Sequence, residues 1–133
     1  MTLTFRLPLP PSVNEMLSLA KKRARLGKRV IPIVYDRAKE RYERECLVCA
    51  RMQRILPPAV PWPVWRIVAA EFAVHNERDP LELYAGAKWP VDWLVSAGYV
   101  LNDSPRELVH VGEPVQRIDR KHPGLLLTIQ RVG

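Results

Sequence analysis

The sequence predicts a single α+β (α/β) domain, with a small mixed β-sheet of about four strands and two main helices. Residues 2–8 alternate apolar and polar side chains, the period-two pattern of a half-buried strand. Residues 124–132 place Leu125, Leu127 and Ile129 on one face, as a strand would. Residues 64–75 are apolar on both faces, as expected of a central strand that is covered on both sides. Residues 36–56 repeat apolar side chains at helical spacing. At 133 residues, with 47% of them hydrophobic, we expect one domain, residues 1–133.

The first expected strand carries Leu3, Phe5 and Leu7 on one face. The prolines that follow end it, because proline has no N–H to donate to a β-ladder. Asn14 comes after this proline-rich turn. Two roles stay open for it: a turn residue that caps its own backbone, or a residue of the functional site.

A strongly basic block lies between residues 21 and 29, where six Lys and Arg occur with no acidic residue among them. Because like charges repel, we expect a basic, mobile loop at about residues 18–32. The net charge of +7 and the pI near 9.8 are typical of a nucleic-acid-binding protein, and a merely solubilising loop is the alternative. The candidate DNA-binding residues of the block are Lys21, Lys22, Arg23, Arg25, Lys28 and Arg29.

The helix expected over residues 36–56 begins at Asp36, whose side chain can cap it, and stops before the two prolines that follow. Tyr42, Cys46 and Cys49 fall on its apolar side. Free cysteines in such a position are usually core residues. We therefore expect them to pack in the core rather than to form a redox or zinc site.

A second helix is expected to start between Ala87 and Trp89 and to end at Gly98. The proline that follows the start is tolerated because N–H groups in the first helical turn have no partner within the helix. Lys88 and Asp92 then lie one turn apart. A simple i,i+4 salt bridge is the plainest interpretation of that pair.

Two further strands are expected over residues 108–118 and 124–132, joined by a turn at residues 119–123. No apolar run approaches the ~20 residues that a membrane span needs, and the first residues lack the pattern of a signal peptide. We therefore expect a cytoplasmic protein with no membrane partner.

Four carboxylates within residues 78–104 are the strongest functional signal, because they gather in a chain of net charge +7. They are Asp79, Glu82, Asp92 and Asp103. Carboxylates that lie close together repel one another unless a cation or hydrogen bonds hold them charged. Mg²⁺ takes such oxygen ligands and also reaches substrate phosphates, so a magnesium site is one interpretation and a solvated acidic face is the other.

The same segment, RDPLELYAGAKWPVDWLVSAGYVLNDS at residues 78–104, resembles the core of the RusA-type Holliday-junction resolvases. That core reads roughly D-x-D-N-L-x-x-K-x-x-x-D-x-L and is followed by A-G-x-x-x-D-D. The amino-terminal LPLPPSVNEM is similar to the family's opening P-P-S-x-N through Pro10, Pro11, Ser12 and Asn14. The two matches occur in the same order as in the family.

The resemblance implies a RusA-like fold and a homodimeric, metal-dependent, structure-selective endonuclease. Such an enzyme hydrolyses phosphodiester bonds of four-way DNA junctions in recombination and repair, with Mg²⁺ or Mn²⁺. Asp79 and Asp103 would be catalytic metal ligands, and Asp92 would act with them either as a third ligand or as a partner that supports the ligands. Asn14 would lie near the site and contact DNA. Lys88 would be the catalytic lysine, which offsets phosphate charge or protonates the leaving oxygen.

Three residues depart from the family pattern. Leu81 replaces the second Asp of D-x-D, Glu82 replaces its Asn, and Asn102 replaces the first Asp of D-D. The stretch from Glu82 to Lys88 is longer than the stretch from the family's Asn to its lysine, which suggests a small insertion around residues 83–85. We hypothesise that Glu82 restores the lost metal ligand, although an ungapped alignment would place Glu82 rather than Asp79 on the family's first Asp.

Two alternatives to a junction resolvase stay open. One is a non-catalytic protein that binds branched DNA with a degenerate metal site, and the missing carboxylates favour it. The other is a nuclease that acts on RNA, flaps or other nucleic-acid structures by the same chemistry.

Overall fold

The computed structural model describes residues 1–12, 14–15, 18 and 31–133. The basic block at residues 21–29 and most of the loop expected at 18–32 therefore lie outside the described residues. The elements, in chain order, are β1 (Thr2–Leu7), α2 (Ile31–Met52), β2 (Trp65–Val74), α3 (Pro80–Gly86), α4 (Lys88–Ser96), β3 (Leu108–Val111), β4 (Val115–Ile118) and β5 (Gly124–Arg131).

The strands form one mixed sheet in the order β1-β5-β2-β3, and β4 pairs with β2 further along the same edge. β5 runs antiparallel to both β1 and β2, with Leu127 opposite Phe5 on one side and Ala70 on the other. β3 and β4 run parallel to β2. The single small α+β domain is confirmed, but the described sheet has five strands rather than about four.

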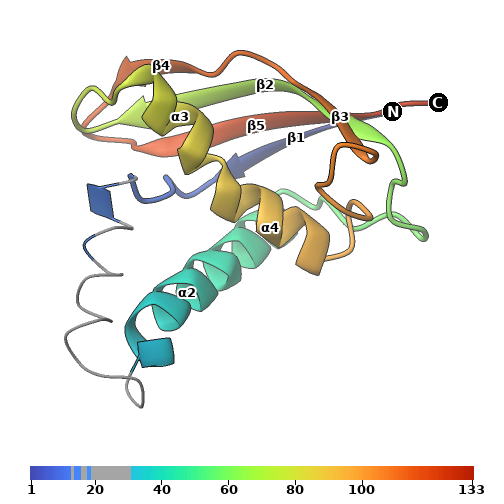
Figure 1. The fold of residues 1–133 in the computed structure, drawn as a ribbon, viewed down its shortest axis with the longest axis horizontal. Helices are drawn as coiled ribbons and strands as arrows, with labels where there is room; N and C mark the ends of the chain where they lie inside the picture. Colours follow the sequence, from blue (N-terminus) through green and yellow to red (C-terminus); the bar gives the residue numbers. More distant parts are fainter. Residues whose placement is uncertain (13, 16–17, 19–30) are drawn as a thin grey trace.

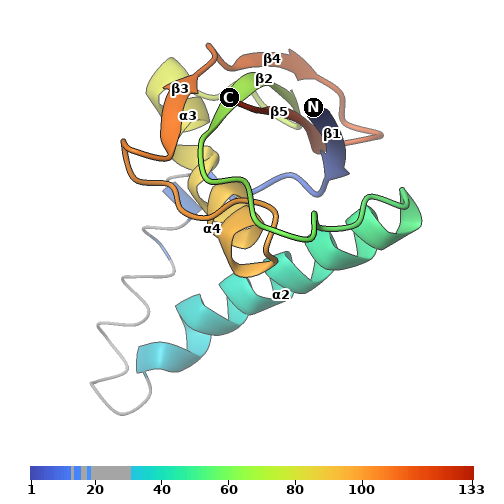
Figure 2. The same ribbon diagram turned by 90° about the vertical axis from the view of Figure 1, so that its right-hand side faces the viewer.

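The parallel pairing of β2 with β3 and β4 determines where the helices of the second half lie. Parallel neighbours cannot be joined by a tight turn and need a crossover of a dozen or more residues, which usually contains a helix. Here the crossover holds α3 and α4. In both Figure 1 and Figure 2, α4 and α2 lie on the same face of the sheet.

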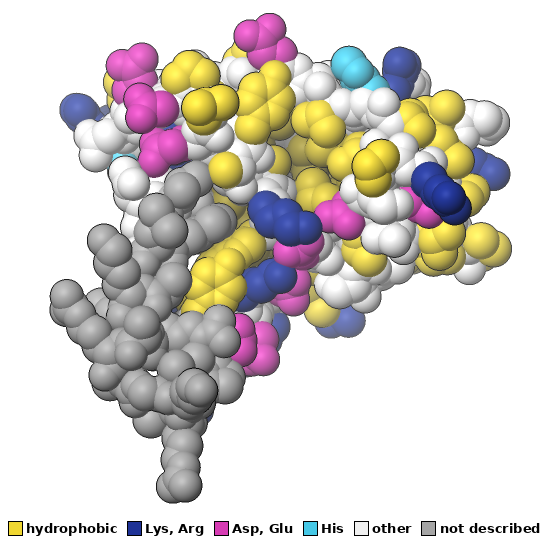
Figure 3. All heavy atoms as spheres, viewed as in Figure 1, with side chains coloured by type: hydrophobic (Ala, Val, Ile, Leu, Met, Phe, Trp, Pro, Cys, Tyr) yellow, Lys and Arg dark blue, Asp and Glu magenta, His cyan; other side chains and the backbone are white. Residues whose placement is uncertain are grey.

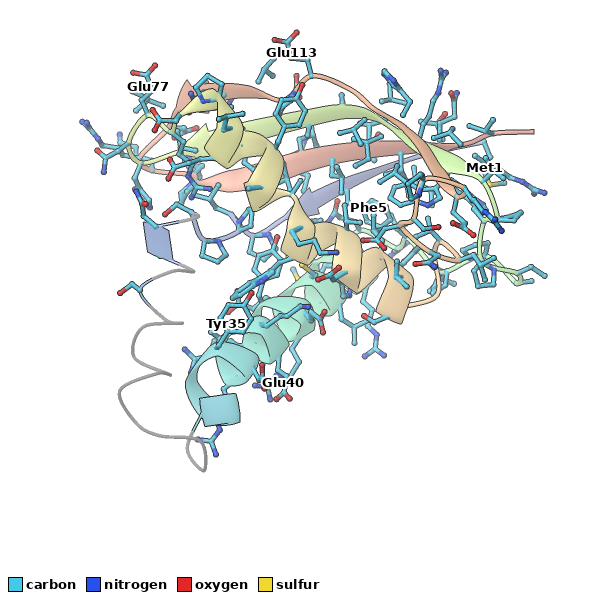
Figure 4. The ribbon with its side chains drawn as sticks, in the orientation of Figure 1. Met1, Phe5, Tyr35, Glu40, Glu77 and Glu113 are labelled. Atoms are coloured by element: carbon cyan, nitrogen blue, oxygen red, sulfur yellow. The ribbon has the colours of Figure 1, made fainter. Side chains whose placement is uncertain are left out.

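Aromatic side chains join the sheet to α4 in the core. Phe5 of β1 packs edge-on against Trp93 and Tyr99, with ring centroids 5.6 and 5.0 Å apart and the rings nearly perpendicular. Phe5 is fully buried and lies between the sheet and α4 (Figure 4). Edge-to-face pairs add about 0.5–1.5 kcal/mol to the hydrophobic gain of each ring. Cys46 of α2 belongs to the same core, as predicted, and burial raises the pKa of its thiol to about 12.

The predicted bounds of the long helix were wrong at both ends. It begins at Ile31, so Asp36 lies inside it and is exposed rather than capping it. It ends at Met52, before the prolines, because Arg54 adopts a left-handed conformation with φ 59°. The N–H groups of Arg54 and of the next residue, Ile55, donate to carbonyls of the last turn at 3.0 and 2.9 Å. This is a Schellman motif in which a non-glycine residue takes the place that glycine usually fills.

The strand predicted over residues 108–118 is divided into β3 and β4. Gly112 donates its N–H to the carbonyl of Ile67 at 2.8 Å, and a Cβ atom at this position would lie 2.4 Å from the carbonyl oxygen of Val68. Pro114 follows and has no N–H to donate. The ladder to β2 is therefore interrupted here and resumes at Val115.

The bounds predicted for the second helix are confirmed. α4 starts at Lys88, within the predicted range, and ends where Gly98 takes φ 84°. The N–H of Tyr99 then donates to the carbonyl of Leu94 at 3.0 Å, which closes the last turn. The short helix α3 was not predicted. Within the described residues, no helix has the length and apolar character needed to cross a membrane.

Replacing Arg54 by glycine is expected to stabilise the protein, because Arg54 holds a backbone conformation that costs a side-chain-bearing residue roughly 1 kcal/mol relative to glycine. Urea denaturation of Arg54→Gly should give a free energy of unfolding about 1 kcal/mol higher than that of the wild type. Arg51→Gly, at an ordinary position in the last turn of α2, is the control and should lower it by a similar amount. A loss of stability in Arg54→Gly would contradict the proposed Schellman motif.

Candidate active site

Three of the residues singled out from the sequence meet on one side of α4. Lys88 and Asp92 come from its first two turns, and Asp103 lies in the loop that follows it. The Lys88 Nζ atom is 2.9 Å from Asp92 Oδ1 and 2.9 Å from Asp103 Oδ2. The expected i,i+4 pair is therefore present, and the same ammonium group also binds the second carboxylate.

Asp92 is bound from its other side by a lysine that the sequence analysis missed. Lys39 of α2 places its Nζ atom 2.7 Å from Asp92 Oδ2. Four charges of alternating sign thus run from α2 across α4 to the following loop: Lys39, Asp92, Lys88, Asp103. We call this set of four ion-paired side chains the charge relay of α4, a name that here implies no proton transfer. Figure 3 shows dark blue and magenta side chains together near the middle of this face. Nothing in the sequence distinguishes Lys39 from the other charged residues of α2.

The charge relay shifts the pKa values of its inner members. Burial opposes ionisation of Asp92, whose side chain is 20% exposed, but hydrogen bonds from Lys39 and Lys88 outweigh it and lower the pKa of the carboxyl. Hydrogen bonds to the two carboxylates raise the pKa of Lys88, and the bond to Asp103 contributes more than the bond to Asp92. At neutral pH both groups are therefore firmly charged.

The loop that carries Asp103 is fixed to the core by two tryptophans. The indole N–H of buried Trp65 donates to the carbonyl of Asn102 at 2.8 Å, and the N–H of Leu101 donates to the carbonyl of Trp62 at 2.9 Å. The Asn102 side chain accepts a hydrogen bond from the N–H of Asp103 at 2.8 Å. Asn102, which departs from the D-D pattern, therefore orients the backbone of the neighbouring carboxylate.

The other two predicted carboxylates have a local structural role at the start of α3. Asp79 is the N-cap residue, with Pro80 at the first helical position, and its N–H donates to Glu82 Oε2 at 3.3 Å. Asp79 lies five residues beyond Val74, the last residue of β2, so the start of α3 rather than the strand holds its backbone. Within the described residues, no hydrogen bond or salt bridge links Asp79 or Glu82 to the charge relay of α4.

A cleft of about 780 Å³ opens beside this helix start. Glu82 lines it, together with Asn14 of the proline-rich turn and Trp89 of α4. Asn14 is exposed, so its predicted place near a functional site is compatible with this geometry. The lining comes from the proline-rich turn, from α2, from the corner between β2 and α3, and from α3 and α4. Glu77 marks that corner in Figure 4, beyond the end of β2.

Arg78 is the unusual residue of the cleft. The residue is only 9% exposed, and its Nη1 atom has no hydrogen-bond partner among the described residues. Gln116 of β4 fixes its backbone through two hydrogen bonds of 2.9 and 2.7 Å. Burial lowers the pKa of the guanidinium, and the carboxylates of Glu15 and Glu82 oppose that shift. Guanidinium groups bind phosphate well, but the Nη1 atom of Arg78 is covered by protein and would reach an anion only if the side chain moved.

Arg78 is the first residue of the segment that resembles the resolvase core, but no role was predicted for it. Gly86 of α3 lies beside the guanidinium: a Cβ atom at this position would be 3.7 Å from both Arg78 Nη1 and the ring of Phe72, an ordinary van der Waals contact. The last residue of α3 and Phe72 of β2 thus lie beside the guanidinium. Such an environment is visible only in three dimensions.

The charge relay can offer two oxygen ligands to a metal ion. Asp92 and Asp103 point at one cation position, which the Lys88 ammonium holds. Mg²⁺ is often bound by one or two carboxylates, several waters and substrate phosphates, so this pair fits it. Within the described part of the chain, no group of three or more His, Cys, Asp and Glu side chains could hold a metal ion.

Comparison with known proteins gives no relative: no protein-family model and no curated protein matches the chain. The resemblance to RusA-type resolvases stays a prediction that depends on the residues quoted above. The six basic DNA-binding candidates at residues 21–29 lie outside the described residues.

Asp92→Asn should destabilise the protein at pH 7 by about 1–2 kcal/mol, because it leaves Lys39 and Lys88 without their shared carboxylate. The pKa of Asp92 is lower in the folded than in the unfolded protein, so its contribution is complete above the ordinary value of about 4. It is lost as pH falls through the lowered folded pKa. Urea denaturation from pH 7 to pH 2.5 should therefore show the difference between wild type and variant shrinking at the acid end.

The control is Asp36→Asn, which changes an exposed aspartate of α2. It should alter stability by less than about 0.5 kcal/mol at every pH. A wild-type and Asp92→Asn difference that is constant down to pH 2.5 would show that the carboxylate charge does not contribute.

Proposed function

We propose that this protein is a metal-dependent, structure-selective DNA endonuclease with a RusA-like fold. One observation carries the proposal: Asp92 and Asp103, which the sequence motif singled out, meet at one cation position on either side of Lys88. The loop that brings Asp103 there is anchored to the buried core through Trp65. Side chains held by rigid elements are the arrangement that metal-assisted hydrolysis needs.

Hydrolysis of a phosphodiester needs a nucleophilic water, a stabilised phosphorus centre and a neutralised leaving oxygen. Mg²⁺ or Mn²⁺, held by Asp92 and Asp103, would supply the Lewis acidity for these tasks. Lys88 would bind the phosphate or give a proton to the leaving oxygen. Asp79 and Glu82 remain candidates for further metal ligands at the neighbouring cleft, where Glu82 already lies.

The proposed substrate is DNA, in particular four-way junctions. The net charge of +7 and the basic residues of the sequence favour a polyanion, since each neutralised phosphate releases counterions. Arg78 lines the neighbouring cleft and adds a positive charge to it. A homodimer would place two such sites on a junction of approximate two-fold symmetry, so that both strands are nicked.

A second candidate is a non-catalytic protein that binds branched DNA. It is favoured because all four carboxylates already have partners in the protein. Lys88 forms salt bridges with Asp92 and Asp103, and Asp79 and Glu82 cap α3. In such a protein the charge relay of α4 would hold the fold together and do no chemistry.

A cleavage assay tests the proposal. A labelled four-way junction, with linear duplex and single strand as controls, is incubated with Mg²⁺, with Mn²⁺ or with EDTA. We expect paired nicks in the junction that require the metal. Asp103→Asn should reduce the rate at least about 100-fold, because it removes a charged metal ligand.

The matched control is Asp119→Asn. Asp119 is also an ion-paired aspartate, 2.9 Å from Arg117 Nη1, but it lies outside the charge relay of α4. It should cleave within about threefold of the wild type, since it touches no proposed site residue. Tight, salt-sensitive junction binding without cleavage by the wild type would favour the non-catalytic candidate instead.

A further inference from the structure

The ammonium group of Lys88 lies at the position where the two carboxylates converge. It is 2.9 Å from Asp92 Oδ1 and 2.9 Å from Asp103 Oδ2, distances typical of charge-assisted hydrogen bonds. These are the carboxylate oxygens that point at the shared cation position. A divalent ion and the ammonium group cannot both use that position.

We propose that Lys88 is a gate on the metal position, which it closes in the free protein and opens when a nucleic-acid phosphate draws its side chain away. This inference rests on the proposed function and adds to it a regulation of the same site: the metal is taken up with the substrate. A protein without bound nucleic acid would then bind little metal.

The structure supplies a lysine that can move at small cost. The Lys88 side chain is 61% exposed, whereas Asp92 and Asp103 are 20% and 28% exposed and are fixed by their surroundings. An exposed lysine has a flexible stem, and each of its two ion pairs here, to Asp92 and to Asp103, contributes little net free energy. A phosphate group offers the ammonium an alternative anionic partner.

Lys39 provides the internal comparison. It carries the same charge and also binds Asp92, at 2.7 Å, but through the other oxygen, Oδ2. It contacts no second carboxylate in the described structure, and its side chain is 31% exposed. Removing either lysine deletes one positive charge beside Asp92, but only removal of Lys88 clears the position between the two carboxylates.

The test is Mn²⁺ binding to the free protein, measured by calorimetry and by the loss of the free-ion electron paramagnetic resonance signal. Lys88→Met should bind Mn²⁺ at least about tenfold more tightly than the wild type, because the competing cation is gone. Lys39→Met should change the affinity less than about threefold, since only its long-range charge is lost. Lys88→Met/Asp103→Asn should lose the gain, which would place the ion at this carboxylate pair.

Junction binding by fluorescence anisotropy, with Ca²⁺ as a metal that takes the same oxygen ligands, provides the second arm. By linkage, a metal that is taken up with DNA must strengthen DNA binding by the same factor. Ca²⁺ should therefore tighten junction binding by the wild type more than by Lys88→Met.

The outcomes separate the gate from the function. Equal Mn²⁺ affinity in the wild type and Lys88→Met, in a wild type that cleaves junctions, would overturn the gate and leave the nuclease in place. Equal gains in Lys88→Met and Lys39→Met would also overturn it, because charge alone would then explain the effect. If the wild type does not cleave junctions, and neither it nor any variant binds Mn²⁺, both the gate and the proposed nuclease function are overturned.

Discussion

The parallel pairing of β2 with β3 and β4 is the constraint on which the rest of the structure depends. It forces the chain to cross the sheet between these strands, and the crossover carries α3, α4 and the loop after α4. All four predicted carboxylates lie on that crossover. The packing of Trp93 and Tyr99 against Phe5 fixes α4 to the sheet, and the hydrogen bond from Trp65 fixes the loop. The site is therefore positioned by the same contacts that form the core.

Much of the fold could be predicted from sequence because periodicity reports burial. The alternation of Leu125, Leu127 and Ile129 and the apolar run of β2 identified strands, and the proline near the start of α4 with Gly98 at its end gave that helix its bounds. The errors arose where a backbone geometry broke the pattern. Arg54 ends α2 in a conformation that sequence rules assign to glycine, and the close approach at Gly112 divides one expected strand into two.

The candidate site was predictable only in part, for a similar reason. A motif lists residues along the chain, and three of those it names, Lys88, Asp92 and Asp103, lie together in the structure. It could not reveal Lys39, which reaches the site from α2 across a separation of 53 residues. The burial of Arg78 was equally hidden, because the residues beside it come from different elements of the fold. Tertiary partners of charged residues carry no local sequence signal.

The charge relay of α4 balances to zero, since its two lysines offset its two aspartates. A divalent ion that replaces the Lys88 ammonium between the aspartates would give the site a net positive charge, because the ion and Lys39 together outweigh the two carboxylates. Concentrated positive charge is costly without a partner, but it attracts a phosphate, and this attraction becomes stronger as water is excluded. The site is thus neutral without the metal ion and positive with it, and a polyanionic substrate responds to this difference in net charge. A protein of net charge +7 can already attract DNA from a distance, so such a local change would act on the phosphate at the site itself rather than on the encounter.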